Sequence, residues 1–340
     1  MKVYIQDNFC TVYKLQSNYI ASYARQKGIF ITDSKSDADV FILGLCAAFK
    51  ADEERSIRLI EDTALFGRKI LIYGCFTTVR EDLAKSFGKT SYYPLWDIQG
   101  MLRELEIDCD DFMPEQSVWP SEFRLKDDYR VYDTRKKFIG ISTGYSFGCV
   151  YCPHKLGSGD LLSRSHAAII AQIGRDLDSG DAKVFILTAT DTAAYGRDIG
   201  SSFAALLENV LAELKKRGSK AKVRIAQFNP EGLVYDREKL LALCCDSRVE
   251  ELQLPIQTSS DRLLELMGRN YRISIVAYDT IIEDLPDTFY PDRPWGKGNN
   301  PKTAVWSFLQ ENDSFVVDES IDSKLLISSS PRGYLRRVAA

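Results

Sequence analysis

The stretch Ile141-Ser-Thr-Gly-Tyr-Ser-Phe-Gly-Cys149-Val-Tyr-Cys152-Pro-His154 decides how the rest of the chain is interpreted. It follows an apolar run, residues 138–142, that is typical of a β-strand. Cys149 and Cys152 are spaced C-x-x-C, and a cysteine at position 145 would complete the triad C-x-x-x-C-x-x-C. Clustered cysteines of this kind are typical ligands of iron–sulfur clusters. Position 145 is a tyrosine, so the motif lacks its first thiol.

The composition of the 340-residue chain indicates a globular protein of a reducing compartment. Hydrophobic residues make up 45% and charged residues 27%, which allows a sizeable core and two domains. The formal net charge of −4 provides no global basic field for nucleic acid. The N-terminus resembles a short strand rather than a signal peptide, and no long apolar run occurs, so we expect a cytoplasmic protein with no membrane partner. Eight cysteines are too sparse for a disulfide scaffold and favour metal or redox chemistry.

The first part of the chain alternates apolar, strand-like runs with helical patterns, which is the signature of a parallel sheet. We expect residues 1–130 to form a small doubly wound α/β domain, followed by a second domain at residues 131–340. The polar, proline-containing stretch before the boundary is typical of a connector. The predicted strands are residues 3–5, 39–44 and 69–73, and the predicted helices are residues 13–27 and 51–66.

Three cysteines each follow one predicted strand of this first domain. They are Cys10, Cys46 and Cys75. The carboxyl ends of parallel strands lie at one edge of a sheet, so the three thiols should converge there. Three thiolates without an obvious fourth ligand suit a [4Fe–4S] cluster with one open iron. The alternative is that each is a small, buried core residue. Cys109 has no such partners and is interpreted as incidental.

The second domain repeats the alternation and predicts four βα units, as in a full or partial parallel barrel. In such barrels the chemistry lies on the loops that follow the strands. Those loops carry Cys149 and Cys152, then Asp191, then Asn229, then Gln257. His166 and the Cys244-Cys245 pair are interpreted as structural. The predicted strands are 138–142, 183–188, 222–227 and 251–255, and the predicted helices are 165–178, 202–217, 236–245 and 260–267.

An ordered set of short segments, spread over residues 1–271, resembles the radical S-adenosylmethionine methylthiotransferases. One such segment alone would be weak evidence, whereas the ordered set is specific. The segments are Asp7-Asn-Phe-Cys10, Leu45-Cys46-Ala-Ala-Phe, Gly74-Cys75, Ser163-Arg164, Asp191-Thr-Ala-Ala-Tyr195-Gly196 and Leu254-Pro-Ile-Gln257-Thr-Ser-Ser260-Asp261, followed by Met267, Arg269 and Tyr271.

This resemblance implies a three-cysteine α/β domain joined to a radical-SAM partial barrel, with two [4Fe–4S] clusters and S-adenosylmethionine as cofactors. It implies a methylthio group, or sulfur, placed on an unactivated carbon, with a reductant such as flavodoxin or ferredoxin. Cys149 and Cys152 would ligate the radical cluster, and the three earlier cysteines the auxiliary cluster. Tyr151, Asp191 and Gln257 would line the cofactor site, with Asp191 and Gln257 also in catalytic positions.

The chain departs from the family pattern at several positions. Tyr145 replaces a cluster cysteine, Ser158 stands where arginine is usual, and Ala189-Thr190 replaces Gly-Gln. After Tyr271 the pattern fades, because residues 287–312 are predicted as loop and only residues 314–317 and 324–328 resemble strands. We expect no room in the chain for the C-terminal RNA-binding barrel that is typical of the family. We therefore expect a small-molecule or peptide acceptor and regard tRNA as an unlikely one.

The tyrosine at position 145 leaves several interpretations of the second thiol site open. Tyr145 could ligate iron through its phenolate, or His154 could supply the third ligand, although His154 could equally be an ordinary loop residue. Cys149 and Cys152 could instead contribute to a zinc site, for which only two local thiols are evident. Finally, the chain could have lost radical chemistry and kept the auxiliary cluster as a sulfur carrier. Asp191 could likewise be a simple loop residue.

Overall fold

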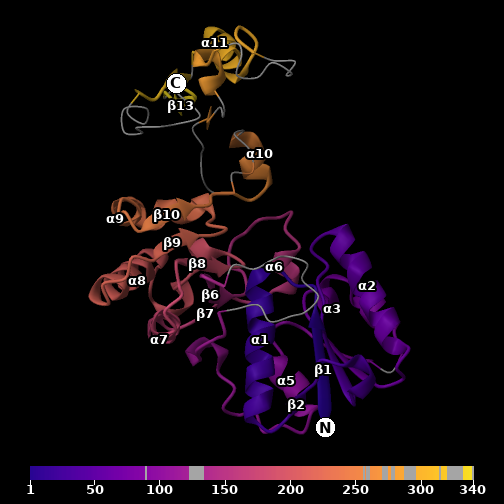
Figure 1. The fold of residues 1–340 in the computed structure, drawn as a ribbon. Coiled ribbons are helices and arrows are strands. Elements are labelled where there is room, and N and C mark those ends of the chain that lie inside the picture. Colours follow the sequence, from indigo (N-terminus) through magenta and orange to yellow (C-terminus); the bar gives the residue numbers. More distant parts are fainter. Residues whose placement is uncertain are drawn as a thin grey trace. The chain divides into compact units, whose positions relative to one another are not determined.

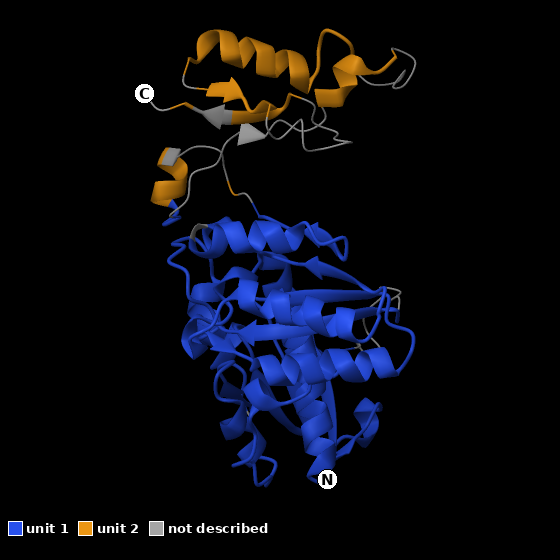
Figure 2. Ribbon diagram, turned by 90° about the vertical axis from the view of Figure 1, so that its left-hand side faces the viewer, with its two compact units in different colours: residues 1–255, 267–269 blue, residues 256–266, 270–340 orange. Residues whose placement is uncertain are grey.

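The structure is a computed structural model that describes residues 1–88, 90–121, 134–255, 257, 261–269, 275–276, 280–286, 296–313, 315–319 and 332–338. It divides into two compact units, which Figure 2 colours separately. The first unit contains residues 1–255 and 267–269, and the second contains residues 256–266 and 270–340. The expected domain boundary near residue 130 lies outside the described residues.

The first unit begins with a parallel sheet that confirms the predicted α/β order (Figure 1). Its two edge strands, β2 and β5, were not predicted. β2 is only two residues long, and β5 has the sequence Thr-Ser-Tyr-Tyr, which is not apolar enough to stand out. In spatial order the strands are β2 (Phe30–Ile31), β1 (Lys2–Asp7), β3 (Val40–Gly44), β4 (Lys69–Tyr73) and β5 (Thr90–Tyr93).

Both faces of this sheet are buried, which explains the continuous apolar runs of its central strands. In β3, Val40 and Ile42 pack on one face, whereas Phe41 and Leu43 pack on the other. The first face is covered by α1 (Thr11–Gln26) and α5 (Ile98–Arg103). The opposite face is covered by α2 (Lys50–Ala64), α3 (Phe76–Val79) and α4 (Glu81–Ala84).

Helix α1 also contacts strands β6 and β8 of the second sheet. Its buried residues therefore surround the helix instead of forming one stripe, and they include Tyr13, Ser17 and Tyr19. On β6, Gly140 allows this close approach, because a Cβ there would lie 3.0 Å from the Trp119 ring and 3.5 Å from Leu15. The two sheets of the first unit are thus packed through α1.

The second sheet of the first unit is parallel except at one edge, where a short strand pairs antiparallel (Figure 1). The parallel strands bear out the α/β fold class and the order of βα units. In spatial order the strands are β10 (Val249–Leu252), β9 (Lys222–Ile225), β8 (Val184–Ala189), β6 (Lys136–Thr143) and β7 (Leu162–Ser163). The helices that follow are α6 (His154–Gly157), α7 (His166–Asp178), α8 (Phe203–Lys216) and α9 (Leu233–Cys244).

An apolar core joins α7, α8 and α9 to one face of this sheet, with Ile141, Leu187 and Ile225 among its strand residues. Two of these helices, α7 and α8, begin with a serine side-chain cap. Ser165 accepts a hydrogen bond from the Ala168 N–H, and Ser202 accepts one from the Ala205 N–H. Short 3-10 turns follow the strands at Thr192–Ala194, Arg197–Ile199 and Pro230–Gly232.

The second unit contains α10 (Asp261–Leu266), a 3-10 turn (Thr280–Asp284), α11 (Pro301–Glu311) and a three-stranded antiparallel sheet among its described residues. The strand order is β11 (Ile275–Val276), β13 (Tyr334–Arg337) and β12 (Phe315–Val317). The described β12 agrees with the predicted strand at residues 314–317, whereas the strand predicted at residues 324–328 lies outside the described residues.

The prediction of a loop over residues 287–312 is wrong for its last part, because α11 occupies Pro301–Glu311. The composition of residues 287–312, rich in Pro, Asp, Gly and Asn, gave no indication that a helix begins there. Asn300 caps the Lys302 and Thr303 amides, Thr303 caps back to Asn300, and Pro301 occupies the first helical position. In the part of the chain that the structure describes, no helix is both long and apolar enough to cross a bilayer.

Candidate functional site

The loops at the carboxyl edge of the first sheet bring three thiols together. Cys10 directly precedes α1, Cys46 follows β3, and Cys75 follows β4. Cys46 and Cys75 are buried, and each thiol acts electrostatically on another of the three. The parallel topology therefore produces the convergence that the sequence predicts.

The backbone around these thiols is shaped by side-chain contacts and by a glycine. Asn8 accepts a hydrogen bond from the Cys46 N–H at 2.9 Å, and its amide donates to Ser56 Oγ at 2.9 Å. Ser56 in turn donates to the Cys46 carbonyl at 2.7 Å. Gly74 has φ +129°, and a Cβ there would lie 2.2 Å from the Leu45 carbonyl oxygen. Residues other than glycine cannot take this position without moving the Cys75 loop.

Two backbone amides point at the sulfurs of this group. The Ala47 N–H donates to Cys75 Sγ at 3.4 Å, and the Ala48 N–H donates to Cys46 Sγ at 3.5 Å. Amide donors to sulfur stabilise thiolates and adjust the potentials of iron–sulfur clusters. The loop from Cys46 to Ala48 therefore presents donors of the kind that a thiolate-bound cluster uses.

Cys10 and Cys46 keep their protons at neutral pH in the metal-free protein. Burial and the nearby Cys46 raise the pKa of Cys10 to about 12. Hydrogen bonding with Cys75 and burial raise the pKa of Cys46, and the same hydrogen bond lowers the pKa of Cys75. A bound metal cluster would have to release these protons, because thiolates are the ligating form.

No group of three or more His, Cys, Asp or Glu side chains is arranged around a single metal-ion position within the described ranges. This excludes a preformed mononuclear site there, such as one for zinc. It does not conflict with a polynuclear cluster, in which each thiolate binds a different iron. The zinc interpretation of Cys149 and Cys152 gains no support.

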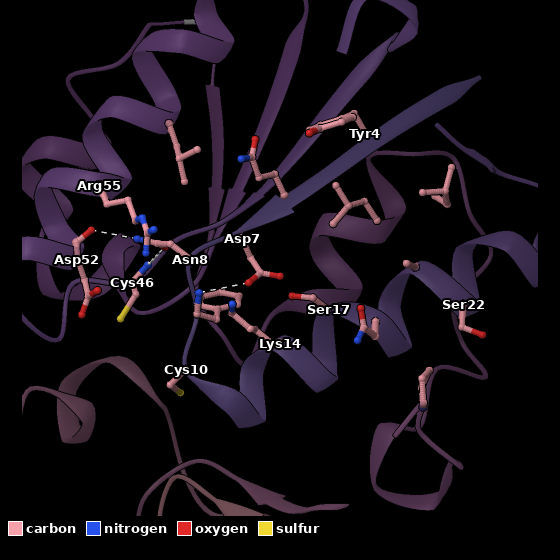
Figure 3. A pocket seen from close by; sticks show the side chains of 18 of the residues that line it. Tyr4, Asp7, Asn8, Cys10, Lys14, Ser17, Ser22, Cys46, Asp52 and Arg55 are labelled. Carbon is pink, nitrogen blue, oxygen red and sulfur yellow. Dashed lines mark hydrogen bonds between the residues drawn. The ribbon is translucent and has the colours of Figure 1, made fainter. Parts of the chain in front are cut away.

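A cavity of about 960 Å³ opens beside Cys10 and Cys46. Figure 3 shows Cys10 at the start of α1 and Cys46 across from it, with Asn8 and Asp52 on the side of Cys46. The wall continues along the polar face of α1, where Lys14, Ser17 and Ser22 lie. Another part of the wall is formed by His154, at the start of α6, and by Gln227, which follows β9.

The second thiol site lies on the loop after β6. The Tyr145 hydroxyl oxygen is 2.6 Å from Cys149 Sγ, and Cys149 is fully buried. Burial and this contact raise the pKa of Tyr145, as does the negative charge of Asp191. Burial and the nearby Cys149 thiol raise the pKa of Cys152. Tyr145, Cys149 and Cys152 therefore form one group, in which the phenol keeps its proton at neutral pH.

A segment distant in sequence closes over this loop. The Val150 N–H donates to the Met267 carbonyl at 3.1 Å, and a Cβ at Gly268 would lie 2.6 Å from the Gly148 carbonyl oxygen. Arg269 Nη2 donates to the Tyr151 hydroxyl at 2.8 Å. Its Nε and Nη1 atoms are buried without a hydrogen-bond partner. The guanidinium thus offers two unused donors beside Tyr151.

Asp191 begins the 3-10 turn after β8, and it is 3% exposed. No donor meets either carboxylate oxygen with full hydrogen-bond geometry, although the Asn229 side chain lies close enough to lower the pKa of Asp191. Burial raises its pKa to about 7, against the opposing charges of Arg269 and Arg197. Arg197 is itself held between the Phe147 and Tyr235 rings, at 4.4 and 4.1 Å from their centroids. Asp191 is therefore a buried acid without a fully formed hydrogen bond.

Contacts of two residues, Tyr13 and Gly157, join the first thiol group to the second. Tyr13, on the first turn of α1 after Cys10, accepts a hydrogen bond from the Gly144 N–H at 3.4 Å and from Thr190 Oγ1 at 3.2 Å. Gly157, in α6 after Cys152, lies against Cys75, so that a Cβ at Gly157 would be 2.4 Å from Cys75 Cβ. The two thiol groups therefore share their supporting residues.

The predicted site residues thus fall into separate places. The first three cysteines come together, and so do Tyr145, Cys149 and Cys152 with Asp191 in charge range. Tyr151 contacts Arg269, whereas His154 lines the cavity of Cys10 and Cys46. Gln257 has an exposed side chain and belongs to the second unit. Ser260 and Tyr271 lie outside the described residues. The roles assigned to these residues stay predictions.

Sequence reasoning missed the contributions of Tyr13, Arg197 and Arg269. Arg269 stood in a recognised segment, but no pattern indicated that it contacts Tyr151. Tyr13 follows Cys10 by one helical turn, which is a weak signal that it faces the same site. Conversely, the structural interpretation of His166 agrees with its contacts, because both ring nitrogens meet partners, Ser201 Oγ at 2.9 Å and Asn209 Nδ2 at 2.6 Å.

Comparison with known proteins finds distant relatives that match most of the length of this chain. A probable threonylcarbamoyladenosine tRNA methylthiotransferase of Archaeoglobus fulgidus is 26% identical over 85% of this chain and 66% of its own length. The human threonylcarbamoyladenosine tRNA methylthiotransferase is 27% identical over 80% of this chain and 48% of its length. The ribosomal protein uS12 methylthiotransferase RimO of Thermotoga maritima is 27% identical over 79% of this chain and 62% of its own length. The chain spans between about half and two thirds of these relatives.

Two further comparisons concern the fold and the C-terminal part. The radical S-adenosylmethionine methyltransferase TsrM of Kitasatospora setae, solved with cobalamin and a [4Fe–4S] cluster, has a TM-score of 0.57 and 13% identity. The likeness covers 80% of this chain and 64% of TsrM and concerns the fold alone. A family profile described as Rhamnosyl O-methyltransferase/CmcI matches residues 269–338, which is too small a part to assign a family to the chain.

These relatives correct the expectation about the acceptor. By their names, they act on tRNA or on a ribosomal protein, which contradicts the view that tRNA is an unlikely partner and that the acceptor is a small molecule. The expectation rested on where the given sequence ends, which does not reveal the acceptor that the site receives. Together, the sheets, the thiol groups and the relatives lead to one conclusion: the chain is similar in sequence to tRNA and ribosomal-protein methylthiotransferases over most of its length, and similar in fold to a radical S-adenosylmethionine methyltransferase.

Proposed function

We propose that the chain is a methylthiotransferase-like protein that transfers sulfur or a methylthio group to an unactivated carbon of tRNA. In this proposal Cys10, Cys46 and Cys75 hold an auxiliary [4Fe–4S] cluster, and S-adenosylmethionine binds near Asp191. The observation that carries the proposal is the pairing of two thiol groups in one compact unit, joined through Tyr13 and Gly157.

The first thiol group fits an auxiliary cluster. It provides three thiols from three strand ends, two amide donors to sulfur, and open space beside Cys10 and Cys46. A cluster bound there would supply a site at which sulfur can be carried. The protein's own part is to position the thiolates at the strand ends, and Asn8 and Ser56 do this by binding the Cys46 backbone.

The unpartnered groups at the second site fit the amino-acid end of S-adenosylmethionine. That end carries an ammonium group and a carboxylate, and the site offers the buried Asp191 carboxylate and two free donors of Arg269. Asp191 and Arg269 act on each other by charge without forming an ion pair. A zwitterion between them would satisfy both buried charges, which are costly when unpaired.

The second thiol group fits a [4Fe–4S] cluster less well. It offers two thiols and a phenol, and the phenol oxygen occupies the position next to Cys149. Two thiolates are fewer than the three that such a cluster takes when one iron is open. We therefore derive no step through a cluster at this position, and an iron count decides whether one binds there.

The choice of tRNA as acceptor rests on the relatives. Archaeal and vertebrate relatives alike are named tRNA methylthiotransferases. A ribosomal protein is the competing acceptor, because RimO is also similar over most of this chain. A methylthio mass added to nucleosides of digested tRNA, and not to peptides of ribosomal protein, is the expected result.

The test begins with anaerobic reconstitution of the full chain. Wild-type protein should bind at least about four irons, lost in Cys46→Ala and retained in Cys109→Ala, which removes a buried thiol outside both groups. Arg269→Gln should weaken binding of S-adenosylmethionine about tenfold or more, measured by equilibrium dialysis. A wild-type protein that neither holds iron nor binds S-adenosylmethionine would contradict the proposal.

A second candidate function is favoured by the contact between Tyr145 and Cys149. In this alternative the protein carries sulfur on the auxiliary cluster but does not cleave S-adenosylmethionine. It predicts about four irons, no 5′-deoxyadenosine after reduction, and unchanged iron in Cys149→Ala. The transferase instead predicts a count rising towards about eight, 5′-deoxyadenosine release, and a loss of iron in Cys149→Ala.

A further inference from the structure

The helix that follows Cys152 leads towards the first thiol group. Helix α6 (His154–Gly157) contacts α3, which begins directly after Cys75. At its end, Gly157 lies against Cys75 and Val79, with no room for a Cβ beside Cys75. Cys75 and α6 are therefore fixed against each other, and His154 stands at the beginning of this short helix.

His154 presents an unsatisfied nitrogen. Its Nδ1 atom is buried and has no hydrogen-bond partner. Buried polar atoms without partners are rare, and one explanation is a ligand that the atom normally binds.

The imidazole shares its surroundings with the thiols. His154, Cys10 and Cys46 line the same cavity of about 960 Å³. The Asp52 carboxylate lies within charge range of both His154 and Cys46. In Figure 3, Asp52 lies near Cys46, with Cys10 across the cavity. His154 thus borders the space beside two of the three thiols, and its helix packs against the third.

Three neighbouring side chains of the wall, Lys14, Asn8 and Asp52, are poorer ligands for iron. Lys14 is a cation, and the amide of Asn8 is occupied by hydrogen bonds to Ser56 and the Asp52 carbonyl. The Asp52 carboxylate is a harder ligand, of the kind that suits magnesium or calcium better than an iron–sulfur cluster. Neutral imidazole binds iron and replaces cysteine in Rieske clusters.

We propose that His154 Nδ1 is the fourth protein ligand of the cluster held by Cys10, Cys46 and Cys75. This inference rests on the proposed auxiliary cluster and adds a ligand from the loop that also carries Cys149 and Cys152. A cluster held in this way would take protein ligands from both sheets of the first unit, and an incoming sulfur species would have to displace the imidazole.

The test uses the full chain with Cys149→Ala and Cys152→Ala, so that iron can bind only at the first group. The chain contains two histidines, which makes labelling specific. The protein is grown with ¹⁵N-histidine, reconstituted anaerobically and reduced, and nitrogen coupling to the cluster is measured by electron–nuclear double resonance. The expected result is one strong histidine ¹⁵N coupling, lost in His154→Ala and kept in His166→Ala.

A second measurement replaces the imidazole with another iron ligand, a thiolate. His154→Cys should retain the iron and lower the midpoint potential, because replacing cysteine by histidine raises the potential of a cluster. Adding ¹⁵N-imidazole to the His154→Ala protein should restore a nitrogen coupling. An unchanged potential in His154→Cys would contradict direct ligation even if one variant folds poorly.

The outcomes separate this inference from the proposed function. Iron present without histidine coupling, or with a coupling that survives in His154→Ala, overturns the ligand and leaves the auxiliary cluster standing. A potential that changes in Asp52→Asn but not in His154→Cys overturns it in favour of the carboxylate. Absence of iron from the Cys149→Ala, Cys152→Ala protein overturns the auxiliary cluster itself and the ligand with it.

Discussion

The hydroxyl oxygen of Tyr145 lies 2.6 Å from the sulfur of Cys149. This contact places the phenol inside the second thiol group, at the position where the sequence motif lacks a cysteine. Burial and Cys149 raise the pKa of Tyr145, so the phenol stays protonated at neutral pH. In the metal-free protein the phenol is therefore a hydrogen-bonding neighbour of the Cys149 thiol.

We predict that Tyr145→Cys increases cluster binding at the second site. The new thiol completes the C-x-x-x-C-x-x-C triad, and the protein should retain about four more irons than wild type after treatment with a chelator. It should also release more 5′-deoxyadenosine on reduction with S-adenosylmethionine present. Tyr145→Phe is the matched control, because it removes the oxygen without adding a thiol, and it should gain no iron. Equal iron in wild type and Tyr145→Cys would show that more than one ligand is missing.

We predict that the buried Asp191 destabilises the metal-free protein as the pH rises. Burial raises its pKa to about 7, above its ordinary value of 3.8. Between these two values the folded state keeps a proton that the unfolded state loses, so stability falls with pH up to about 7 and is constant above it. The loss amounts to at most about 4 kcal/mol.

Urea unfolding at pH 4 to 8 measures this effect. The wild-type free energy of unfolding should decrease across that interval relative to that of Asp191→Asn, which cannot ionise. Parallel pH profiles of the two proteins would show that Asp191 ionises normally in the folded state. Added S-adenosylmethionine should reduce the difference, because its ammonium group would favour the charged carboxylate.

We predict that Gly157→Ala disturbs the first thiol group. The added Cβ would lie 2.4 Å from Cys75 Cβ, so either α6 or the Cys75 loop has to move. Overpacking of this kind costs about 1–3 kcal/mol. Gly88→Ala is the control, because a Cβ there has no atom within 4 Å. The iron bound by Gly157→Ala should fall well below that of the control, and equal iron would mean that the contact yields easily.

We predict that Tyr13→Phe loosens the connection between the two thiol groups. The change removes the phenol oxygen that contacts the Gly144 amide and the Thr190 hydroxyl, at a cost of about 1 kcal/mol. Burial raises the pKa of Tyr13 to about 12, so this oxygen stays neutral over the assay range. Hydrogen exchange at Gly144 should accelerate roughly fivefold.

Tyr19→Phe provides the matched control on the same helix. The Tyr19 hydroxyl donates to Ser117 Oγ at 2.8 Å, away from the Cys149 loop. Its loss should cost similar stability and leave the Gly144 amide unchanged. If both variants accelerate exchange at Gly144 equally, the effect comes from general loosening of α1 and not from the Tyr13 contact.

Several elements could be predicted because their residues repeat a local pattern. The runs at residues 40–44 and 69–73 are buried on both faces, so nearly every position is apolar and the strands stand out. Elements whose formation depends on caps or pairing were missed. Helix α11 begins with the Asn300 capping box inside a polar stretch, and β5 forms because it pairs with β4.

The sequence by itself determined that strands and helices alternate, and hence that the thiols of Cys10, Cys46 and Cys75 meet at one edge of a parallel sheet. This follows from local periodicity and from the direction of parallel strands. Only the tertiary structure decided that His154 borders the space beside the first thiol group, that Tyr13 reaches Gly144, and that Arg269 contacts Tyr151. Those contacts join residues far apart in the chain, and their geometry depends on how α1, α6 and the 267–269 segment pack, which no local pattern encodes.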